Sequence, residues 1–428
     1  MGIRILHISD IHLGSGQNHG RTNPLTGLNT RVEDFHRALQ TAVDQALNLP
    51  VDVVLFTGDA FPDATPAPWI QELFAQQFLR LVAAQIPVLL LVGNHDQHTQ
   101  GEGGASLSIY RALQVPGVIV GESLTTYTLE TRNGAIQIVT LPWITRSMLL
   151  TKPETQGLSM TEINELLLTR LREVLAGEIL NLDEHIPAIL AAHVMADKAL
   201  FGAERLLSAG KNLTVPLSLL AQPCFRYVAL GHVHRHQVLC EKPPVVYAGS
   251  IERVDFSEEE EQKGYVLIDI TPTETRFEFC PLPTRLMRTI RVDVTQSADP
   301  QTELLTRIQN TPIADGIIRL IYRLQAEQLP KINEAQIRSA LATAHSYTLQ
   351  PELVNEQPRQ RVTQVDLSQV LDPMTVLEQY VRENEHLHPL KTDLLAAAQA
   401  LLAGVEPEWT EAPPAIPTPE TAQLPLSF

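Results

Sequence analysis

Short apolar runs alternate with amphipathic helical patterns over the first two thirds of the chain. Runs of aliphatic and β-branched residues predict strands at residues 3–8, 53–57, 88–92, 189–192 and 227–230. Between the first two runs, an apolar stripe of helical period through Val32, Phe35, Leu39 and Val43 predicts a helix. This alternation of strands and helices predicts an α/β fold.

Local signals refine these elements. Thr30 and Glu33 are expected to form a capping box at the start of the first helix. Asn133-Gly134 between two alternating segments predicts a hairpin. Ser159 and Glu162 predict the cap of a helix that runs to about Gly177.

A second pattern begins near residue 285. The expected order is strand, helix, strand, helix, strand, at residues 289–294, 302–309, 317–324, 333–344 and 346–350. Two further helices are expected at about 373–383 and 389–403, followed by a Pro-rich acidic tail that should be disordered. We therefore divide the chain into a first domain at residues 1–284, a small α+β capping domain at 285–355, a helical pair at 370–404 and a tail at 405–428.

Composition limits the class of protein. The 428 residues are 44% hydrophobic, enough for sizeable cores in more than one domain. We expect a soluble cytoplasmic protein without a membrane segment, because the sequence has neither a signal peptide nor an apolar run of spanning length. No GxxxxGK[ST] motif is present, so ATP hydrolysis would have to come from a partner.

Five groups of metal-ligating residues follow the five predicted strands. They are Asp10-Ile11-His12, Gly58-Asp59, Gly93-Asn94-His95-Asp96, His193 and Gly231-His232-Val233-His234. Ligands of open α/β folds bind at the carboxyl ends of the strands, so these groups can gather at one edge. Each alone has an ordinary interpretation, because Gly-Asp marks turns, Asp10-x-His12 could cap a helix, and a lone histidine often ends a strand. The ordered set favours a metal site.

The residue types suit two divalent ions about 3.5–4 Å apart, which need a bridging carboxylate. Asp59 is the candidate bridge, and His232 and His234 can serve one ion each. Asn94 can also ligate. His95 then remains as the candidate general acid, with Asp96 expected to hold its tautomer.

In order and spacing, the five groups resemble those of the calcineurin-like metallophosphoesterases, whose fold is a two-sheet sandwich flanked by helices. Three longer segments resemble the SbcD family, the nucleases of SbcCD complexes: residues 5–14 (ILHISDIHLG), 29–35 (NTRVEDF) and 247–256 (YAGSIERVDF). The resemblance covers roughly residues 1–290.

The resemblance implies one ion on Asp10, His12, Asp59 and His234, and a second on Asp59, Asn94, His193 and His232. It implies Mn²⁺ as the metal, with His95 matching the family's catalytic histidine. The implied activities are double-strand 3′–5′ exonuclease and single-strand endonuclease by a two-metal mechanism in DNA repair. The implied partners are DNA ends, hairpins and single strands, and an SbcC-type ATPase bound by the helical pair, in a heterotetramer that contains a homodimer of this chain.

Some features depart from this pattern. The segment Ala60-Phe61-Pro62-Asp63-Ala64 lacks the arginine with which related protein phosphatases hold phosphate. Some nuclease relatives have a second histidine in this region, but no histidine lies between Asp59 and Val92 in this chain. The alternatives are a metallophosphodiesterase for small molecules such as cyclic nucleotides and a non-catalytic scaffold for an ATPase. The loop at residues 15–28 could line a substrate groove or simply connect elements at the surface.

The formal charge of −17 is unusual for a nucleic-acid enzyme. Metals would neutralise some carboxylates, and others are expected to cluster away from the site, at residues 258–261 and in the tail. The stretch 285–347 is more basic and contains Arg288, Arg291, Arg319 and Arg323. These arginines could form a DNA-contacting face, or they could belong to an ordinary solvated sheet face.

Overall fold

The computed structural model describes residues 2–49, 51–98, 104–150, 152–200, 213–354, 373–383, 388 and 390–402. The chain divides into two compact units, Met1–Val354 and Asn355–Phe428. The expected tail at 405–428 lies outside the described residues, as does Asp372, at the start of the predicted helical pair.

The first sheet has the strand order β14-β13-β1-β2-β3-β4. Its parallel strands are β1 (Ile3–Ile8), β2 (Val53–Phe56), β3 (Val88–Leu91) and β4 (Val118–Gly121). On the other edge of β1, β13 (Gly264–Ile270) and β14 (Thr275–Pro281) run antiparallel to their neighbours. Strands β2 and β3 are buried at every position, as expected for parallel strands covered on both faces.

The second sheet has the order β11-β12-β10-β7-β6-β5. Its four central strands are parallel: β6 (Gly134–Leu141), β7 (Ala188–His193), β10 (Phe225–Gly231) and β12 (Pro244–Tyr247). Strands β5 (Thr125–Thr131) and β11 (Gln237–Glu241) close its two edges in antiparallel orientation. A separate short pair is formed by β8 (Met195–Ala196) and β9 (Thr214–Val215).

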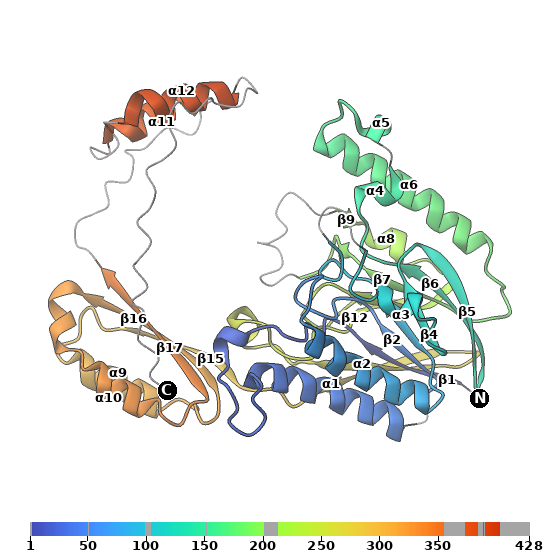
Figure 1. The fold of residues 1–428 in the computed structure, drawn as a ribbon, viewed down its shortest axis with the longest axis horizontal. Helices are drawn as coiled ribbons and strands as arrows, with labels where there is room; N and C mark the ends of the chain where they lie inside the picture. The colour runs from blue at the N-terminus through green and yellow to red at the C-terminus, as the bar shows by residue number, and fades with distance from the viewer. Residues whose placement is uncertain are drawn as a thin grey trace, which may run out of the picture. The chain divides into compact units, whose positions relative to one another are not determined.

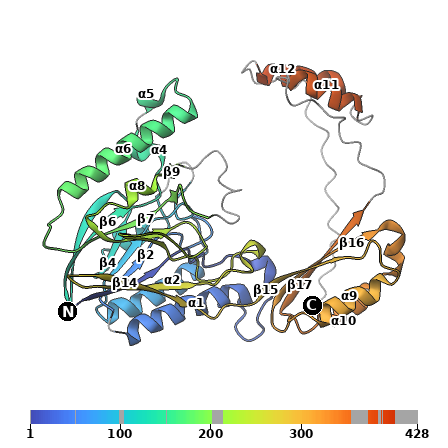
Figure 2. The same ribbon diagram turned by 180° about the vertical axis from the view of Figure 1, so that it is seen from behind.

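The two sheets stack face to face through a shared apolar core. This core joins Ile5, Leu55 and Leu89 of the first sheet to Ile138, Ile189 and Tyr227 of the second. Helices α1 (Thr30–Asn48) and α2 (Pro68–Ala83) cover the outer face of the first sheet, and α6 (Met160–Leu180) covers the second (Figures 1 and 2). The predicted α/β sandwich flanked by helices is confirmed.

Shorter elements lie in the connections along the chain. They are the helices α3 (Ser108–Ala112), α4 (Arg146–Leu149), α5 (Lys152–Thr155) and α8 (Leu217–Leu220), and the 3₁₀ turns η1 (Gln17–His19), η2 (Phe256–Glu258) and η3 (Ala326–Lys331). No helix among the described residues combines the length and the apolar character needed to cross a bilayer.

A smaller sheet follows, here called the small sheet. It consists of the parallel strands β15 (Met287–Asp293), β16 (Ile317–Gln325) and β17 (Ser346–Val354). Helices α9 (Pro300–Gln309) and α10 (Glu334–Ala340) cover one face through an apolar core. The predicted order of strands and helices in this region is therefore confirmed.

The small sheet contacts the loop that follows β1. The Ser346 hydroxyl donates to the His19 carbonyl at 2.5 Å, and the Thr30 hydroxyl lies 2.8 Å from His345 Nε2. The loop at residues 15–28 thus includes an ordered 3₁₀ turn that packs against the start of β17.

Of the four arginines that could form a DNA-contacting face, two are engaged within the fold. The Arg319 guanidinium lies over the Phe256 ring, 4.3 Å from its centroid, and Arg323 pairs with Asp293 at 3.2 Å. Arg291 is exposed. An ion pair and a cation–π contact thus engage part of the positive charge of residues 285–347.

The second unit contains α11 (Pro373–Glu383) and α12 (Lys391–Leu402), which pack against each other. Val381 is fully buried, whereas Tyr380 and Leu390 are about half exposed. Both predicted helices of the pair are therefore present.

The prediction of the first helix cap is wrong by one residue. Asn29, not Thr30, caps α1, because its side chain accepts the Arg31 backbone N–H. Glu33 does not complete a capping box, since its carboxylate accepts from Asn23 and Thr26 in the preceding loop. The Glu33 side chain, which the local pattern assigned to the capping box, therefore forms its hydrogen bonds with the preceding loop instead.

The other two local predictions are confirmed. Ser159 and Glu162 form a reciprocal capping box, and the helix runs to Leu180. The hairpin joins β5 to β6, with Gly134 at a φ of 119° beside the turn. Such a backbone conformation favours glycine.

Candidate metal centre

The carboxyl ends of five neighbouring strands converge at one edge of the sandwich. Strands β1, β2 and β3 are parallel neighbours in the first sheet, and β7 and β10 are parallel neighbours in the second. Each is followed, or ended, by one of the predicted ligand groups. Because the sheets stack, loops separated by about half the chain meet over this edge.

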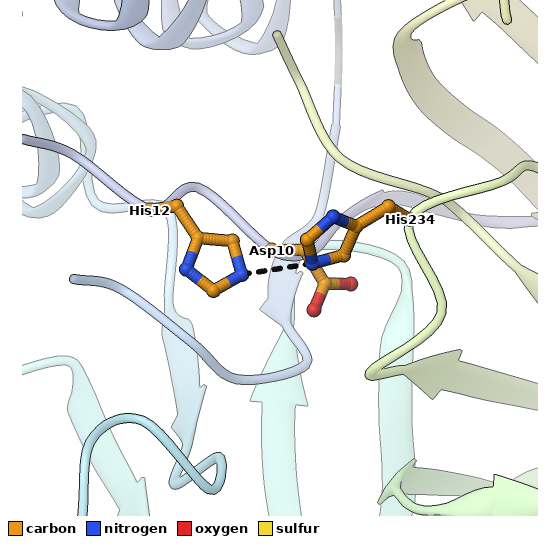
Figure 3. Close-up of side chains that lie close together, drawn as sticks. All are labelled: Asp10, His12 and His234. Carbon is orange, nitrogen blue, oxygen red and sulfur yellow. Dashed lines mark hydrogen bonds between the residues drawn. The ribbon is translucent and has the colours of Figure 1, made fainter. Parts of the chain in front are cut away.

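The first group of candidate ligands is Asp10, His12 and His234. One potential ligand atom from each lies within 4.8 Å of the others, and all three side chains have little exposure. The Nε2 atoms of His12 and His234 face each other at 3.0 Å (Figure 3). Two imidazole nitrogens pointing at one place are suited to share a cation.

The second group is Asp59, His193 and His232, which meets the same criterion of 4.8 Å. Asn94 joins it, since its Oδ1 lies 2.8 Å from His232 Nδ1 and 3.0 Å from His193 Nε2. All the predicted ligands are thus gathered into two adjacent clusters.

Asp59 lies between the clusters. Its Oδ2 is 3.3 Å from His193 Nε2 and 3.7 Å from His12 Nε2, one histidine from each cluster. Burial alone would raise the pKa of Asp59, but the surrounding imidazoles, His193 foremost, hold it well below its ordinary range. An ionised carboxylate in this position can bridge two ions.

The side chains fit divalent cations. Burial and neighbouring imidazoles lower the pKa of His232 to about 3 and that of His12 well below its ordinary value, so both rings keep lone pairs for a metal. His232 Nε2 is buried without a hydrogen-bond partner among the described residues. The set of oxygen and imidazole donors without thiolate suits divalent metal ions of the first transition series.

The backbone at the ligands is strained. Asp10, His12, Asp59 and His232 all have positive φ, between 45° and 98°. Such conformations cost on the order of 1–3 kcal/mol each in non-glycine residues and persist only where surrounding contacts impose them. Here the contacts are hydrogen bonds between the loops, such as His12 N–H to the Asp59 carbonyl at 3.0 Å and His232 N–H to the Asp10 carboxylate at 3.1 Å.

Glycines permit this close approach. A Cβ on Gly231 would lie 2.2 Å from the Thr57 carbonyl oxygen, and one on Gly93 would lie 2.1 Å from Asp59 Oδ1. Neither neighbour can move without disturbing the clusters. A residue without a side chain is therefore required at position 231, where the two sheets come into contact.

Each cluster contains a histidine held by a second partner. His193 Nδ1 lies 2.7 Å from the Thr57 carbonyl, and His234 Nδ1 lies 2.6 Å from Glu258 Oε1. Such partners fix the tautomer and leave Nε2 to the metal. The expectation that residues 258–261 lie away from the site is therefore wrong for Glu258, which is buried and contacts a candidate ligand.

Sequence reasoning also missed Trp143. Its ring lies 4.8 Å from that of His232 at an interplanar angle of 34°. Trp143 comes just after the end of β6, the neighbour of β7, so its position after a parallel strand was an available signal. The indole packs one side of the second cluster.

His95 lies at the border of both clusters but is held differently from expectation. Its ring is 5.0 Å from that of His12, and its Nδ1 is 2.8 Å from the Pro62 carbonyl. Asp96 does not hold the His95 tautomer. Its oxygens accept the backbone N–H groups of Gly93, Asp59 and Ala60, so it shapes the loops that carry the ligands.

Fold and site together define a metal-dependent phosphoesterase. The chain belongs to the calcineurin-like phosphoesterase family, whose model matches residues 3–236. The family is one of hydrolases with a dinuclear metal site, in agreement with the two adjacent clusters.

Several solved structures match part of this chain and are distant from it in sequence. A dimetal phosphatase from Danio rerio is 14% identical, with a TM-score of 0.42, over 65% of this chain and 96% of its own. A purple acid phosphatase from yellow lupin is also 14% identical, with a TM-score of 0.38, over 66% of this chain and 52% of its own. The sulfate thiohydrolase SoxB of Thermus thermophilus is 12% identical, with a TM-score of 0.33, over 65% and 56%.

Proposed function

We propose that this protein is a metal-dependent DNA nuclease, the nuclease component of an SbcCD-type DNA repair complex. It would hydrolyse phosphodiesters as a double-strand 3′–5′ exonuclease and a single-strand endonuclease. DNA ends, hairpins and single strands are the proposed substrates, and Mn²⁺ is the proposed metal.

The observation that carries this proposal is the meeting of two SbcD-like segments around Arg31. This arginine is fully buried and pairs with Asp34 at 2.8 Å. It also donates to the Arg253 carbonyl at 2.6 Å and lies 3.7 Å from Glu252. Residues of the segments 29–35 and 247–256 thus share one buried polar network, and the second segment also reaches the first cluster, where the Ser250 N–H donates to the His234 carbonyl at 3.0 Å. Motifs that share a network support a common origin more strongly than separate matches do.

The chemistry follows from the positions of the side chains. Asp10, His12, Asp59 and His234 would hold one ion, and Asp59, Asn94, His193 and His232 the other. Bound divalent cations stabilise negative charge that develops on the phosphate. His95, with its ring protonated, would donate the Nε2 proton to the leaving 3′ oxygen; the contact of Nδ1 with the Pro62 carbonyl, which leaves Nε2 for the substrate side, supports this role.

The helical pair is the proposed docking element for an SbcC-type ATPase. Tyr380 on α11 and Leu390 beside α12 leave apolar surface exposed at 52% and 51%. Amphipathic helices recognise grooves of partner proteins through such side chains. A heterotetramer containing two copies of this chain is part of the proposal.

An assay with Mn²⁺ tests the function. The full chain is offered linear duplex DNA, hairpin DNA, single-stranded DNA and a cyclic nucleotide, with and without the ATPase. We expect cleavage of the DNA substrates and no turnover of the cyclic nucleotide. Hydrolysis of the cyclic nucleotide without DNA cleavage would establish a small-molecule phosphodiesterase instead.

A further inference from the structure

A buried carboxylate outside the ligand motifs contacts only one of the two clusters. Glu258 Oε1 lies 2.6 Å from His234 Nδ1, and the carboxylate is 5% exposed. Its other oxygen lies 2.8 Å from Lys263 Nζ and accepts the Val254 N–H at 3.0 Å. Both carboxylate oxygens are therefore committed within the fold.

This arrangement favours the ionised carboxylate. The fully buried Lys263 lies opposite it, with Nζ 2.8 Å from Glu258 Oε2 and 2.7 Å from Glu261 Oε2. Lys263 also donates to the His234 carbonyl at 3.1 Å. One lysine thus fixes both the backbone of the histidine and the carboxylate that contacts its ring.

The two clusters differ in this respect. His193 of the second cluster is held by a neutral backbone carbonyl of Thr57, whereas His234 of the first is held by a charged side chain. A charged acceptor makes the imidazole a stronger electron donor to a metal. Loss of the charged partner should therefore change the affinity of the first cluster for its ion and leave that of the second cluster unchanged.

Glu258 also lies on a segment that contacts the small sheet. We call residues 250–263 the strap. Phe256 packs with Met287 and Ile317 and under the Arg319 guanidinium. Glu259 accepts the Thr289 N–H at 2.6 Å. The residues on both sides of Glu258 are thus anchored to β15 and β16.

We propose that Glu258 is a positioning residue for the ion held by Asp10, His12 and His234, and that docking of the strap on the small sheet sets the affinity for that ion. The carboxylate accepts from His234 Nδ1–H and so directs Nε2 into the first cluster. The small sheet keeps the carboxylate in place through Phe256 and Glu259. The inference rests on the metal centre of the proposed function but not on DNA as the substrate.

Metal titration of the full chain tests the positioning role. Mn²⁺ is added to wild type, to Glu258→Gln and to the matched control Glu260→Gln, an exposed position on the same strap. Free Mn²⁺ is counted by its electron paramagnetic resonance signal. We expect Glu258→Gln to lower the affinity for one Mn²⁺ ion by about 10–100-fold, the usual effect of removing the hydrogen-bond partner of a metal ligand. The second ion should bind as in wild type, and the control should leave both unchanged.

A second variant tests whether the effect of Glu258→Gln comes from disturbed folding around Lys263. Glu258→Asp keeps a negative charge opposite Lys263 but draws the carboxylate back by one methylene, so the contact with His234 should be lost while the lysine stays paired. It should show the same selective loss of one ion. Wild-type affinity for both ions in either folded variant, or equal weakening of both, would overturn the positioning role.

Phe256→Ala tests the coupling to the small sheet. The substitution does not alter a metal ligand or Glu258, yet we expect it to lower the affinity for the same ion by several-fold. Unchanged affinity in Phe256→Ala would overturn the coupling. Because the readout is the number of bound ions, a failed inference is distinguishable from a failed DNA assay.

Discussion

His95 Nδ1 lies 2.8 Å from the carbonyl oxygen of Pro62, and this contact determines which ring nitrogen faces the metal clusters. The carbonyl can only accept, so the proton resides on Nδ1 in the neutral ring. Nε2 is then the atom that can exchange a proton with a substrate. A backbone group, rather than the expected Asp96, defines this geometry.

His95→Gln should therefore separate proton transfer from metal binding. We expect both ions to remain bound while DNA turnover falls by roughly 10²–10⁴-fold, the usual contribution of a general acid. Metal titration and single-turnover kinetics measure the two effects. His98→Gln, which removes a histidine from the same loop, serves as the control.

The leaving group provides a further check on His95. A nitrophenyl phosphodiester needs no proton for departure, so its hydrolysis should be much less affected than that of DNA. An equal loss on both substrates would exclude proton donation, and loss of an ion would make His95 a ligand.

Asp59→Asn should abolish activity at every Mn²⁺ concentration. The neutral amide lacks the negative charge with which the carboxylate oxygen Oδ2, 3.3 Å from His193 Nε2 and 3.7 Å from His12 Nε2, can bridge two ions. Calorimetry should show fewer than two ions per chain. Asp63→Asn, an exposed position in the following loop, should bind two, and two intact sites in Asp59→Asn would refute the bridge.

Asp34 should make stability depend on pH. Its carboxylate accepts from Arg285 at 2.6 and 2.8 Å and from Arg31 at 2.8 Å, which joins α1 to the chain that enters the small sheet. Burial alone would raise the pKa of Asp34, but the two arginines lower it below the ordinary value of 3.8. A lowered pKa in the folded state stabilises the fold above the unfolded value, and this contribution is lost as pH falls through the folded value.

Asp34→Asn should accordingly reduce the free energy of unfolding at pH 7 by about 1.5–3 kcal/mol, the range for hydrogen bonds to charged groups. The difference from wild type should shrink as pH falls below about 4, where the carboxylate of the unfolded chain becomes protonated, and it should vanish once pH passes the lower pKa of the folded state. Urea denaturation at several pH values measures it. Arg37→Gln, which removes a largely exposed partner at 3.5 Å, should cost less than about 1 kcal/mol at any pH.

Removal of residues 370–428 should abolish co-purification with an SbcC-type ATPase. It should leave Mn²⁺-dependent cleavage of single-stranded DNA by the isolated chain unchanged, because the clusters lie within the first unit, Met1–Val354. Pull-down and nuclease assays measure the two properties. A complex that survives the deletion would show that the helical pair is not the docking element.

The ligands could be predicted from the sequence because each lies at the end of a predicted strand or within a few residues after it. The position of Asp59 after β2, for example, needs only the strand pattern and the preference of metals for carboxylates. The partners of these ligands could not be predicted in this way. Glu258 stands in a run of glutamates that is typical of a solvated surface, and its burial depends on Lys263 and on the return of the strap to His234.

The same distinction explains the two local errors. Asp96 is next to His95 in sequence, yet the turn directs its carboxylate to backbone N–H groups. Glu33 is at the right distance for a capping box, yet Asn23 and Thr26 offer competing donors from a loop with no regular pattern. Sequence spacing defines which contacts are possible, and tertiary structure selects among them.

The backbone anchor of His193 cannot be removed by substitution at Thr57, because every residue at that position still offers a carbonyl. The anchor of His234 is a side chain and can be lost through a single codon change at Glu258. Random substitutions can therefore remove the anchoring partner of His234 in the first cluster but not that of His193 in the second. Among substitutions outside the ligands themselves, those that weaken the binding of a single ion should therefore affect the half that contains His234, and a screen of random mutants for metal affinity would recover them at position 258.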